Sequence, residues 1–322
     1  MKKKILIIML IIAVAIGIAI WVTTRKHEEV KNDNLKIVTS FYPIHVMTAN
    51  ITQNVPDVEL VNITEANVGC LHDYTISTTD MKKIEKRVLD YWTVRAHDFG
   101  VVRRNEIHNK LSKRWSDELD RLLPEGKLRI LDVGTGTGYF AVLLAAKGHT
   151  VTGIDLTPAM IGEAKALADE LDISARFEVM DAQSLDFPDE SFDAVVTRNL
   201  TWTLPEPQRA YSEWLRVLAP GGILINFDAS YGNNVRNNEH NGTHLPVGNV
   251  YGHCGMTPEL ESENAQITLS MPISKKPRPE WDAELLKSLG CADCGFDKSA
   301  GTRILAENDL SDAPMFLVWA KK

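Results

Sequence analysis

The chain has 322 residues, of which 44% are hydrophobic and 24% are charged, and it contains four cysteines. This length allows one large domain or two modest ones, and the composition excludes a disordered chain, a collagen-like repeat and a disulfide-stapled miniprotein. The 43 acidic residues outnumber the 35 basic ones. Because phosphate binding needs a concentrated basic face, this balance argues against nucleic acid as the main partner.

The most apolar part of the chain is an uncharged run of 18 residues from Ile5 to Val22. As a helix it would span about 27 Å, close to the thickness of the hydrocarbon layer of a membrane. Three lysines precede the run, and Trp21 lies at its end, where an interfacial aromatic residue is typical. A cleaved signal peptide has a shorter apolar region. We therefore expect residues 1–24 to be a single-pass transmembrane helix, with a cleaved signal segment as the alternative.

Residues 25–86 are expected to hold a charged linker and a small αβ fragment, with strands at 36–40 and 58–63 and a helix at 41–53. The segments KIVTSFYPIHVMTANI and VELVNITEANVGCLHDYTISTTDMKKIEK resemble the opening of the metal-binding proteins that serve zinc or manganese ABC importers. In that family the histidine of the HDY motif is a metal ligand, which implies His72 here. A four-coordinate site needs ligands from several segments, so we interpret the fragment as truncated and retained by gene fusion.

From residue 81 the apolar residues follow a helical spacing, which predicts helices up to residue 122. Strands and helices then alternate, as is typical of a parallel sheet with helices on both faces. The sequence thus predicts an α/β, Rossmann-like fold with a mostly parallel seven-stranded sheet. The expected strands are 128–133, 150–155, 176–180, 192–197, 222–227, 304–307 and 315–320, and the expected helices between them are 138–147, 158–171 and 205–218.

The first of these strands leads into a glycine-rich turn that contains Asp132, Gly134, Gly136 and Gly138. Glycines at such a turn let the backbone approach a ligand that a Cβ atom would repel. A phosphate-binding P-loop would end in Gly-Lys-Ser/Thr, which is missing here, and a dinucleotide fingerprint would need glycine where Tyr139 stands. The carboxylate of Asp132 would repel a pyrophosphate but attract the ammonium of an amino-acid moiety.

The next two strands also end in carboxylates. Asp155 ends the second strand, where a carboxylate can accept hydrogen bonds from both hydroxyls of a ribose. Asp181 follows the third strand and is suited to the exocyclic amine of adenine, with the backbone N–H of Ala182 beside it. Leu156 and Met160 offer apolar surface to the adenine ring. A ligand with an ammonium, a ribose and an adenine but no phosphates is S-adenosylmethionine.

Four segments in this order resemble the class I S-adenosylmethionine-dependent methyltransferases of the small-molecule type: LDVGTGTGYF, VTGIDLTPAMI, MDAQSLDFPDESFDAVVTRNLTW and LRVLAPGGILINF. The resemblance is strong over residues 88–228, implies a methyltransferase domain over residues 87–322, and implies that the last two strands form an antiparallel hairpin. The cofactor-binding residues that it implies are Asp132, Gly134, Thr135, Gly136, Gly138, Asp155, Leu156, Met160, Asp181, Ala182 and Asn199.

The helix before the first strand often covers the cofactor pocket in this family. Tyr91, Trp92 and Phe99 occupy the corresponding positions, and Arg95 would meet the carboxylate of the cofactor. The alternative is that these aromatic residues only pack the helix onto the sheet.

The methyl acceptor is expected to bind under residues 229–275, a stretch rich in Asn, Gly and His where this superfamily usually inserts a substrate cap. A merely solvated insert is the alternative. A general base is needed if the acceptor is a hydroxyl, but not if it is a thiol, an amine or a carbanion. We assign no catalytic residue; the side chains on the acceptor side are Thr201, Trp202, His240, His244 and His253.

A cysteine group raises the further possibility of a zinc site or a redox pair. Cys254, Cys291 and Cys294 lie in the same part of the sequence as three histidines, but a single Cys-x-x-Cys motif is a weak signal. We therefore predict no metal site. The Cys291–Cys294 pair is expected at the C-terminus of a helix and the turn that follows it.

The sequence favours an enzyme that moves a methyl group to a small-molecule acceptor by in-line displacement. The alternative is a membrane-anchored extracytoplasmic zinc or manganese binding protein with a non-catalytic methyltransferase-like domain. The lysines before the apolar run favour a cytoplasmic N-terminus and an exported domain. Since S-adenosylmethionine is a cytoplasmic cofactor, we nevertheless expect the methyltransferase domain to face the cytoplasm. The acceptor atom and the oligomeric state are not predicted.

Overall fold

The computed structural model describes residues 35–39, 48–49, 51–53, 55–56, 58–62, 78–241, 254–305 and 315–322. The chain divides into two compact units, residues 1–76 and residues 77–322, which are described separately. The apolar run at residues 5–22 lies outside the described residues, as does His72. Among the helices that the structure does describe, none has the length and apolar character needed to cross a membrane.

The smaller unit contains a pair of parallel strands, β1 (Leu35–Thr39) and β2 (Val58–Asn62). Both strands were expected from the sequence. Residues 48–49 and 51–52 are helical, within the helix expected at 41–53. The importer-like interpretation of this fragment stays a prediction.

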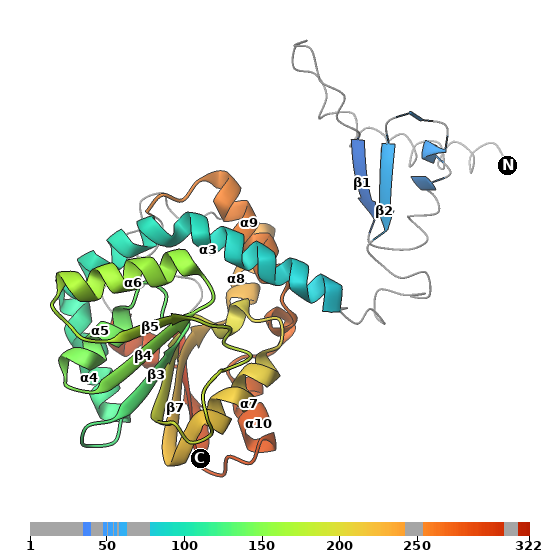
Figure 1. Ribbon diagram of the computed structural model, residues 1–322. Coiled ribbons are helices and arrows are strands. Elements are labelled where there is room, and N and C mark those ends of the chain that lie inside the picture. The colour runs from blue at the N-terminus through green and yellow to red at the C-terminus, as the bar shows by residue number, and fades with distance from the viewer. Residues whose placement is uncertain are drawn as a thin grey trace. The chain divides into compact units, whose positions relative to one another are not determined.

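The larger unit is built on a seven-stranded sheet with the order β5-β4-β3-β6-β7-β9-β8 (Figure 1). Strands β3 to β7 pair with one another in parallel, and β9 is antiparallel to both β7 and β8. This confirms the Rossmann-like, mostly parallel sheet. The strands are β3 (Arg129–Val133), β4 (Thr150–Asp155), β5 (Arg176–Val179), β6 (Phe192–Arg198), β7 (Leu218–Ala229), β8 (Cys294–Asp297) and β9 (Met315–Lys321).

Helices cover both faces of this sheet (Figure 1). On one face lie α4, α5, α6 and α11; on the other lie α7 and α10; α3 packs against α6 and α9. Their bounds are α3 (Thr78–Ile107), α4 (Lys110–Leu122), α5 (Tyr139–Ala146), α6 (Pro158–Glu170), α7 (Pro207–Val217), α8 (Tyr231–Asn241), α9 (Pro258–Ser270), α10 (Glu280–Ser288) and α11 (Ala300–Leu305), with 3₁₀ turns η2 (Thr201–Thr203) and η3 (Pro272–Lys275).

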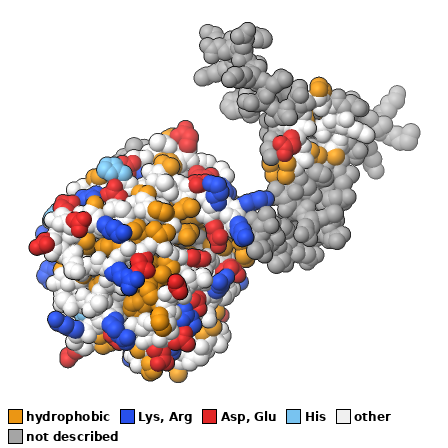
Figure 2. Space-filling model, in the orientation of Figure 1, with side chains coloured by type: hydrophobic (Ala, Val, Ile, Leu, Met, Phe, Trp, Pro, Cys, Tyr) orange, Lys and Arg blue, Asp and Glu red, His pale blue; other side chains and the backbone are white. Residues whose placement is uncertain are grey.

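Large aromatic side chains fill the two layers between the helices and the sheet. Trp115 of α4 is fully buried and makes edge-to-face contacts with Phe140 and Phe227, each at a centroid distance of 5.0 Å. On the opposite face, Trp214 and Tyr211 of α7 form a second buried pair. Charged side chains of both signs cover the outer surface, with apolar side chains gathered in the middle of the face shown in Figure 2.

The C-terminal part of the sheet differs from the sequence prediction. The prediction of a strand at 304–307 is wrong, because residues 300–305 form the helix α11. Ala300 and Ile304 are buried one turn apart, a helical spacing that so short an apolar run does not reveal. The strand that pairs with β9 is instead β8, which begins at Cys294, where a turn was expected. The closing strands are still antiparallel. Residues 229–275 are also more regular than expected, since they include α8 and α9.

Candidate functional site

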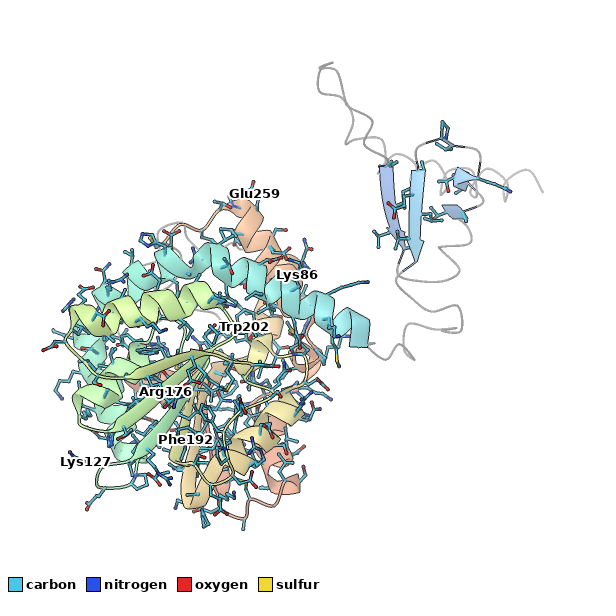
Figure 3. All side chains as sticks on the ribbon, in the orientation of Figure 1. Lys86, Lys127, Arg176, Phe192, Trp202 and Glu259 are labelled. Carbon is cyan, nitrogen blue, oxygen red and sulfur yellow. The ribbon has the colours of Figure 1, made fainter. Side chains whose placement is uncertain are left out.

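A cavity of about 250 Å³ opens at the carboxyl ends of the parallel strands, between them and α3. Here the strand order switches sides: β4 and β5 follow β3 on one side of it, and β6 and β7 lie on its other side. Such a switch point is the usual ligand site in open α/β sheets. Lys127 and Phe192 lie at the far end of the sheet, whereas Trp202 lies beneath α3 (Figure 3).

The glycine turn forms one wall of this cavity through the backbone of Gly134 and Gly136. Both residues have positive φ, +65° and +54°, which favours glycine. A Cβ atom on Gly134 would lie 2.7 Å from the side chain of Leu200, which also lines the cavity. The turn therefore brings bare backbone to the ligand space, as the sequence predicts.

Asp132, Thr135 and Gly138 do not line the cavity, although the sequence placed them at the cofactor. The Asp132 carboxylate is buried, and its Oδ2 accepts hydrogen bonds from Thr135 Oγ1 at 2.6 Å and from Ala141 N at 3.1 Å. It thus ties the glycine turn to the first turn of α5. Its direct contact with an ammonium stays a prediction that this geometry does not favour.

Burial raises the pKa of Asp132 to about 7. Since the unfolded chain releases this proton near pH 4, the stability that Asp132 contributes is present below about pH 4 and is lost as the pH rises toward 7. We expect the unfolding free energy of the wild type to fall relative to Asp132→Asn over this interval, by on the order of 3 kcal/mol. Urea unfolding of both proteins without ligand measures this difference, and parallel pH profiles would contradict the expectation.

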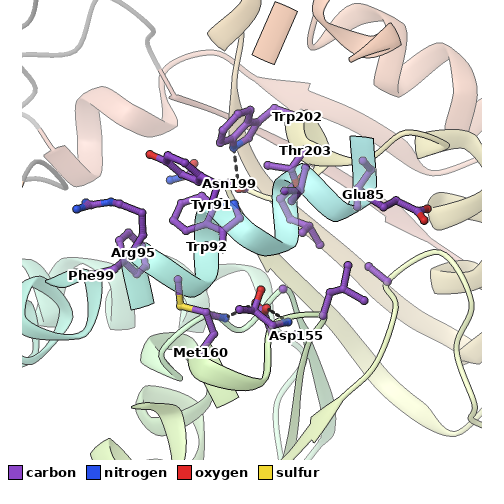
Figure 4. Close-up of a pocket in the computed structure, with 18 of the residues that line it drawn as sticks. Glu85, Tyr91, Trp92, Arg95, Phe99, Asp155, Met160, Asn199, Trp202 and Thr203 are labelled. Atoms are coloured by element: carbon purple, nitrogen blue, oxygen red, sulfur yellow. Dashed lines mark hydrogen bonds between the residues drawn. The ribbon is translucent and has the colours of Figure 1, made fainter. Parts of the chain in front are cut away.

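Asp155 lies at the end of β4 with both carboxylate oxygens beside the cavity wall (Figure 4). Oδ2 accepts from Gly136 N at 3.0 Å, and Oδ1 accepts from Thr157 N at 2.8 Å. Each oxygen keeps a second lone pair for a ligand hydroxyl. Burial raises the pKa of the Asp155 carboxyl.

The end of the cavity near β5 is acidic. Asp181 Oδ1 accepts from the backbone N of Gln183 at 2.8 Å, and Ala182 lies beside it in the cavity wall. Glu85, which sequence reasoning missed, reaches this end from α3 (Figure 4). Burial and the nearby Asp181 raise the pKa of Glu85. Leu156 and Met160 line the same cavity, as expected.

Asn199 follows β6 in a left-handed conformation, with φ of +56°. Its backbone N donates to Phe227 O at 2.7 Å, and its backbone O accepts from Trp202 Nε1 at 2.8 Å (Figure 4). The side-chain Oδ1 is buried and has no hydrogen-bond partner among the described residues, so it is available to a ligand. Asn199, which the sequence predicts at the cofactor site, therefore lines the cavity.

Helix α3 forms the wall opposite Asp155 and Met160 (Figure 4). Tyr91, Trp92 and Phe99 pack edge to face, with centroid distances of 5.2 Å and 5.6 Å between successive rings. The two readings of these aromatics are thus compatible, since the rings line the cavity and also pack the helix. Arg95 lines the cavity too and donates a hydrogen bond to Cys254 O.

The two described residues on the acceptor side, Thr201 and Trp202, differ in their relation to the cavity. Trp202 lines the cavity, whereas Thr201 is buried behind it and hydrogen-bonds Asp228. Nothing is described of the side chains of His240, His244 and His253. Tyr231, Met256 and Asn264 add the wall that sequence reasoning missed; only their position in the insert at 229–275 hinted at it.

The structure describes three of the cysteines. Cys291 is buried, Cys294 is half-buried and Cys254 is exposed; none is in a disulfide. Burial raises the pKa of the thiols of Cys291 and Cys294, which disfavours the thiolate needed for metal or redox chemistry. In the part of the chain that is described, no group of three or more His, Cys, Asp or Glu residues could hold a metal.

A buried ionic network supports the cavity from behind. Arg278 donates to both oxygens of Asp282 at 2.8 Å, to Asp228 at 2.9 Å and to Thr201 at 2.8 Å. Asp228 in turn accepts from the backbone N of Trp202 at 3.2 Å. The network joins the end of β7 to η2 and α10 and fixes the backbone of a cavity residue.

Comparisons with known proteins agree with this geometry. Residues 131–226 match the family model described as a methyltransferase domain. The chain is 41% identical over 99 residues to a phosphatidylethanolamine N-methyltransferase of Cereibacter sphaeroides, covering 30% of this chain and 48% of that protein. It is 39% identical over 133 residues to a demethylmenaquinone methyltransferase of Thermus thermophilus, covering 39% and 60%. The chain thus spans about half the length of these curated relatives.

A solved structure also shares the fold. It is a phosphoethanolamine N-methyltransferase of Haemonchus contortus in complex with phosphomonomethylethanolamine and S-adenosylhomocysteine, with a TM-score of 0.51 and 16% identity over 73% of this chain and 60% of that one. Residues 131–226 thus match the model of a methyltransferase domain, and the strand order and the cavity at the switch point agree with the fold of such a domain.

Proposed function

We propose that this chain transfers a methyl group from S-adenosylmethionine to a small-molecule acceptor. The observation that carries the proposal is that three groups far apart in sequence line one cavity: the glycine turn, Asp155 at the end of β4, and Asp181 with Ala182 after β5. Relatives named for phosphatidylethanolamine and demethylmenaquinone support an acceptor that is a small molecule.

The residues present fit the cofactor by their chemistry. Asp155 would hold the ribose hydroxyls, and the Asp181–Ala182 end would hold the adenine between Leu156 and Met160. The unpartnered Oδ1 of Asn199 offers an acceptor for the ammonium of the methionine end. When bound, S-adenosylmethionine supplies a methyl group on a sulfonium sulfur. The task left to the protein is to align the acceptor in line and to exclude water, for which the rings of Tyr91, Trp92 and Trp202 are placed.

Calorimetric titration of the full chain with S-adenosylhomocysteine tests the proposal. We expect binding with a one-to-one stoichiometry and no comparable binding of NAD⁺, because the glycine turn has Tyr139 where a dinucleotide fingerprint needs glycine. Absence of S-adenosylhomocysteine binding by folded protein would overturn the proposal.

We further propose that residues 1–24 anchor the protein in a membrane, with the methyltransferase domain on the cytoplasmic side. The length of the apolar run and the terminal Trp21 support the anchor, and the cofactor supports the side. An alkaline phosphatase fused after Lys322, which is active only when exported, is expected to be inactive; an active fusion would place the domain outside.

A further inference from the structure

Two arginines share the carboxylate of Glu106 beside the cavity: Arg103 is buried and lines the cavity, whereas Arg198 is half-buried and is not among the lining residues. Arg103 of α3 lines the cavity and pairs with Glu106 Oε2, while Arg198 at the end of β6 donates to Glu106 Oε1 at 3.2 Å. The side chains of Arg103 and Glu106 are only 7% and 3% exposed. Among the described residues, two guanidinium groups thus face one carboxylate, which leaves a surplus positive charge beside the cavity.

The arginines are framed by aromatic rings. Arg198 lies over the ring of Trp115 at 4.3 Å, and Arg103 lies over Phe99 at 4.5 Å. The Nε and Nη1 groups of Arg198 are buried and donate no hydrogen bond to any described residue. Burial and the charge of Arg103 lower the pKa of Arg198.

Asp132 is a further carboxyl near Arg198, and the two hydrogen bonds to its Oδ2 come from Thr135 and Ala141. Among the described residues, no hydrogen bond joins Asp132 to Arg198, and burial raises the pKa of Asp132, which favours the neutral form of its carboxyl. The surplus charge is therefore not neutralised from that side. A buried cation without a counter-charge is costly, and a bound anion would remove the cost.

The position of the pair relates it to the acceptor and not to the adenine. Burial and the charge of Asp228 raise the pKa of Tyr231 of α8, whereas the charges of Arg198 and Arg103 lower it. The ring of Tyr231 packs on that of Trp202 at a centroid distance of 5.0 Å. Both Tyr231 and Trp202 line the cavity. The carboxylates of the cavity, by contrast, belong to Glu85, Asp155 and Asp181. The cavity is thus divided into an acidic end and a basic end.

We propose that Arg103, with Arg198 behind it, binds an oxyanion of the methyl acceptor, so that the substrate is a small molecule with a carboxylate or phosphate group. The inference rests on the proposed function, because it takes the acceptor to enter the same cavity. The described residues that line the cavity include no His, Lys or Cys, and a guanidinium pair disfavours an ammonium beside it. Guanidinium groups suit carboxylate and phosphate because they donate parallel hydrogen bonds.

Benzoate and benzamide are suitable probes, because they have nearly the same shape and differ in charge. The full chain is saturated with S-adenosylhomocysteine and titrated with each probe up to about 10 mM, a range that reports weak binding. We expect benzoate to bind about tenfold or more tightly than benzamide, in line with the strength of charge-assisted hydrogen bonds. Equal affinities, or no detectable binding of benzoate, would overturn the inference.

Variants assign the preference to the pair. Arg103→Met leaves Glu106 paired with Arg198, so the fold is expected to persist while the preference for benzoate falls to nearly one. Lys86→Met removes a charge from the same helix at an exposed ion pair and is expected to change nothing. Thermal unfolding and S-adenosylhomocysteine affinity verify that each variant is folded. An unchanged preference in Arg103→Met would overturn the inference.

Two further outcomes separate the possible failures. If benzoate is preferred only by the ligand-free protein and is displaced by S-adenosylhomocysteine, the pair binds the carboxylate of the cofactor, and the inference about the acceptor is wrong. If S-adenosylhomocysteine does not bind at all, the proposed function fails. The comparison of benzoate with benzamide in the ligand-free protein then still tests whether the pair binds an oxyanion.

Discussion

Replacing Asp155 by alanine is expected to weaken S-adenosylhomocysteine binding by about a hundredfold or more. In the proposed complex its two oxygens each accept a hydrogen bond from a ribose hydroxyl, and each charge-assisted bond contributes about 1.5–3 kcal/mol. A loss of about 3 kcal/mol corresponds to roughly a hundredfold in affinity. Calorimetric titration of the full chain measures it.

The fold is expected to survive this substitution. Burial already raises the pKa of Asp155, so the fold disfavours its charged form, although Gly136 N and Thr157 N lose their acceptor. Asp155→Asn keeps one acceptor oxygen and should lose only about tenfold. Asp186→Ala, on an exposed loop, serves as the matched control and should bind like the wild type. Wild-type affinity in Asp155→Ala would show that the ribose contact is misassigned.

Replacing Arg278 by methionine is expected to lower the free energy of unfolding by about 3–5 kcal/mol, the cost of leaving buried carboxylates without their partner. Arg278 is the cation for both Asp228 and Asp282, whose side chains are 0% exposed. Methionine fills part of the space, so the loss comes mainly from charge and hydrogen bonding. Urea unfolding measures the loss, and a loss below about 1 kcal/mol would contradict a central role for the network.

The pH dependence of this loss provides a second test. Burial raises the pKa of Asp228, and without Arg278 the neutral form is favoured further. The folded variant then takes up a proton that the unfolded chain has released, so its lost stability should partly return as the pH falls from about 7 to about 5. Lys113→Met, which breaks an exposed ion pair with Asp117, should cost less than about 0.5 kcal/mol at either pH.

The site could be predicted from the sequence where its residues lie on the turns that follow parallel strands. The carboxyl ends of β3, β4, β5 and β6 share one edge of the sheet, so residues such as Gly136, Asp155 and Asn199 had to come together once the strands were recognised. Asp132 shows the limit of this reasoning. It ends β3 at the same edge, but its side chain turns into the protein toward Ala141.

The remaining residues of the site depend on how helices pack over the sheet, which no local pattern specifies. Glu85 and Arg103 lie five turns apart on α3, and only the packing of α3 brings both to the cavity. Tyr231 and Met256 come from the insert after β7. Likewise, the short run at Ile304 suits a strand or a buried helix equally well, and its contacts with the core decide for α11.

A crystal structure of the full chain with S-adenosylhomocysteine tests the central claim most directly. The ligand is expected in the cavity beneath α3, with both ribose hydroxyls at hydrogen-bonding distance from the Asp155 carboxylate and the adenine beside Asp181 and Ala182. A ligand bound elsewhere, or one whose ribose does not meet Asp155, would contradict the assignment of this cavity as the cofactor site.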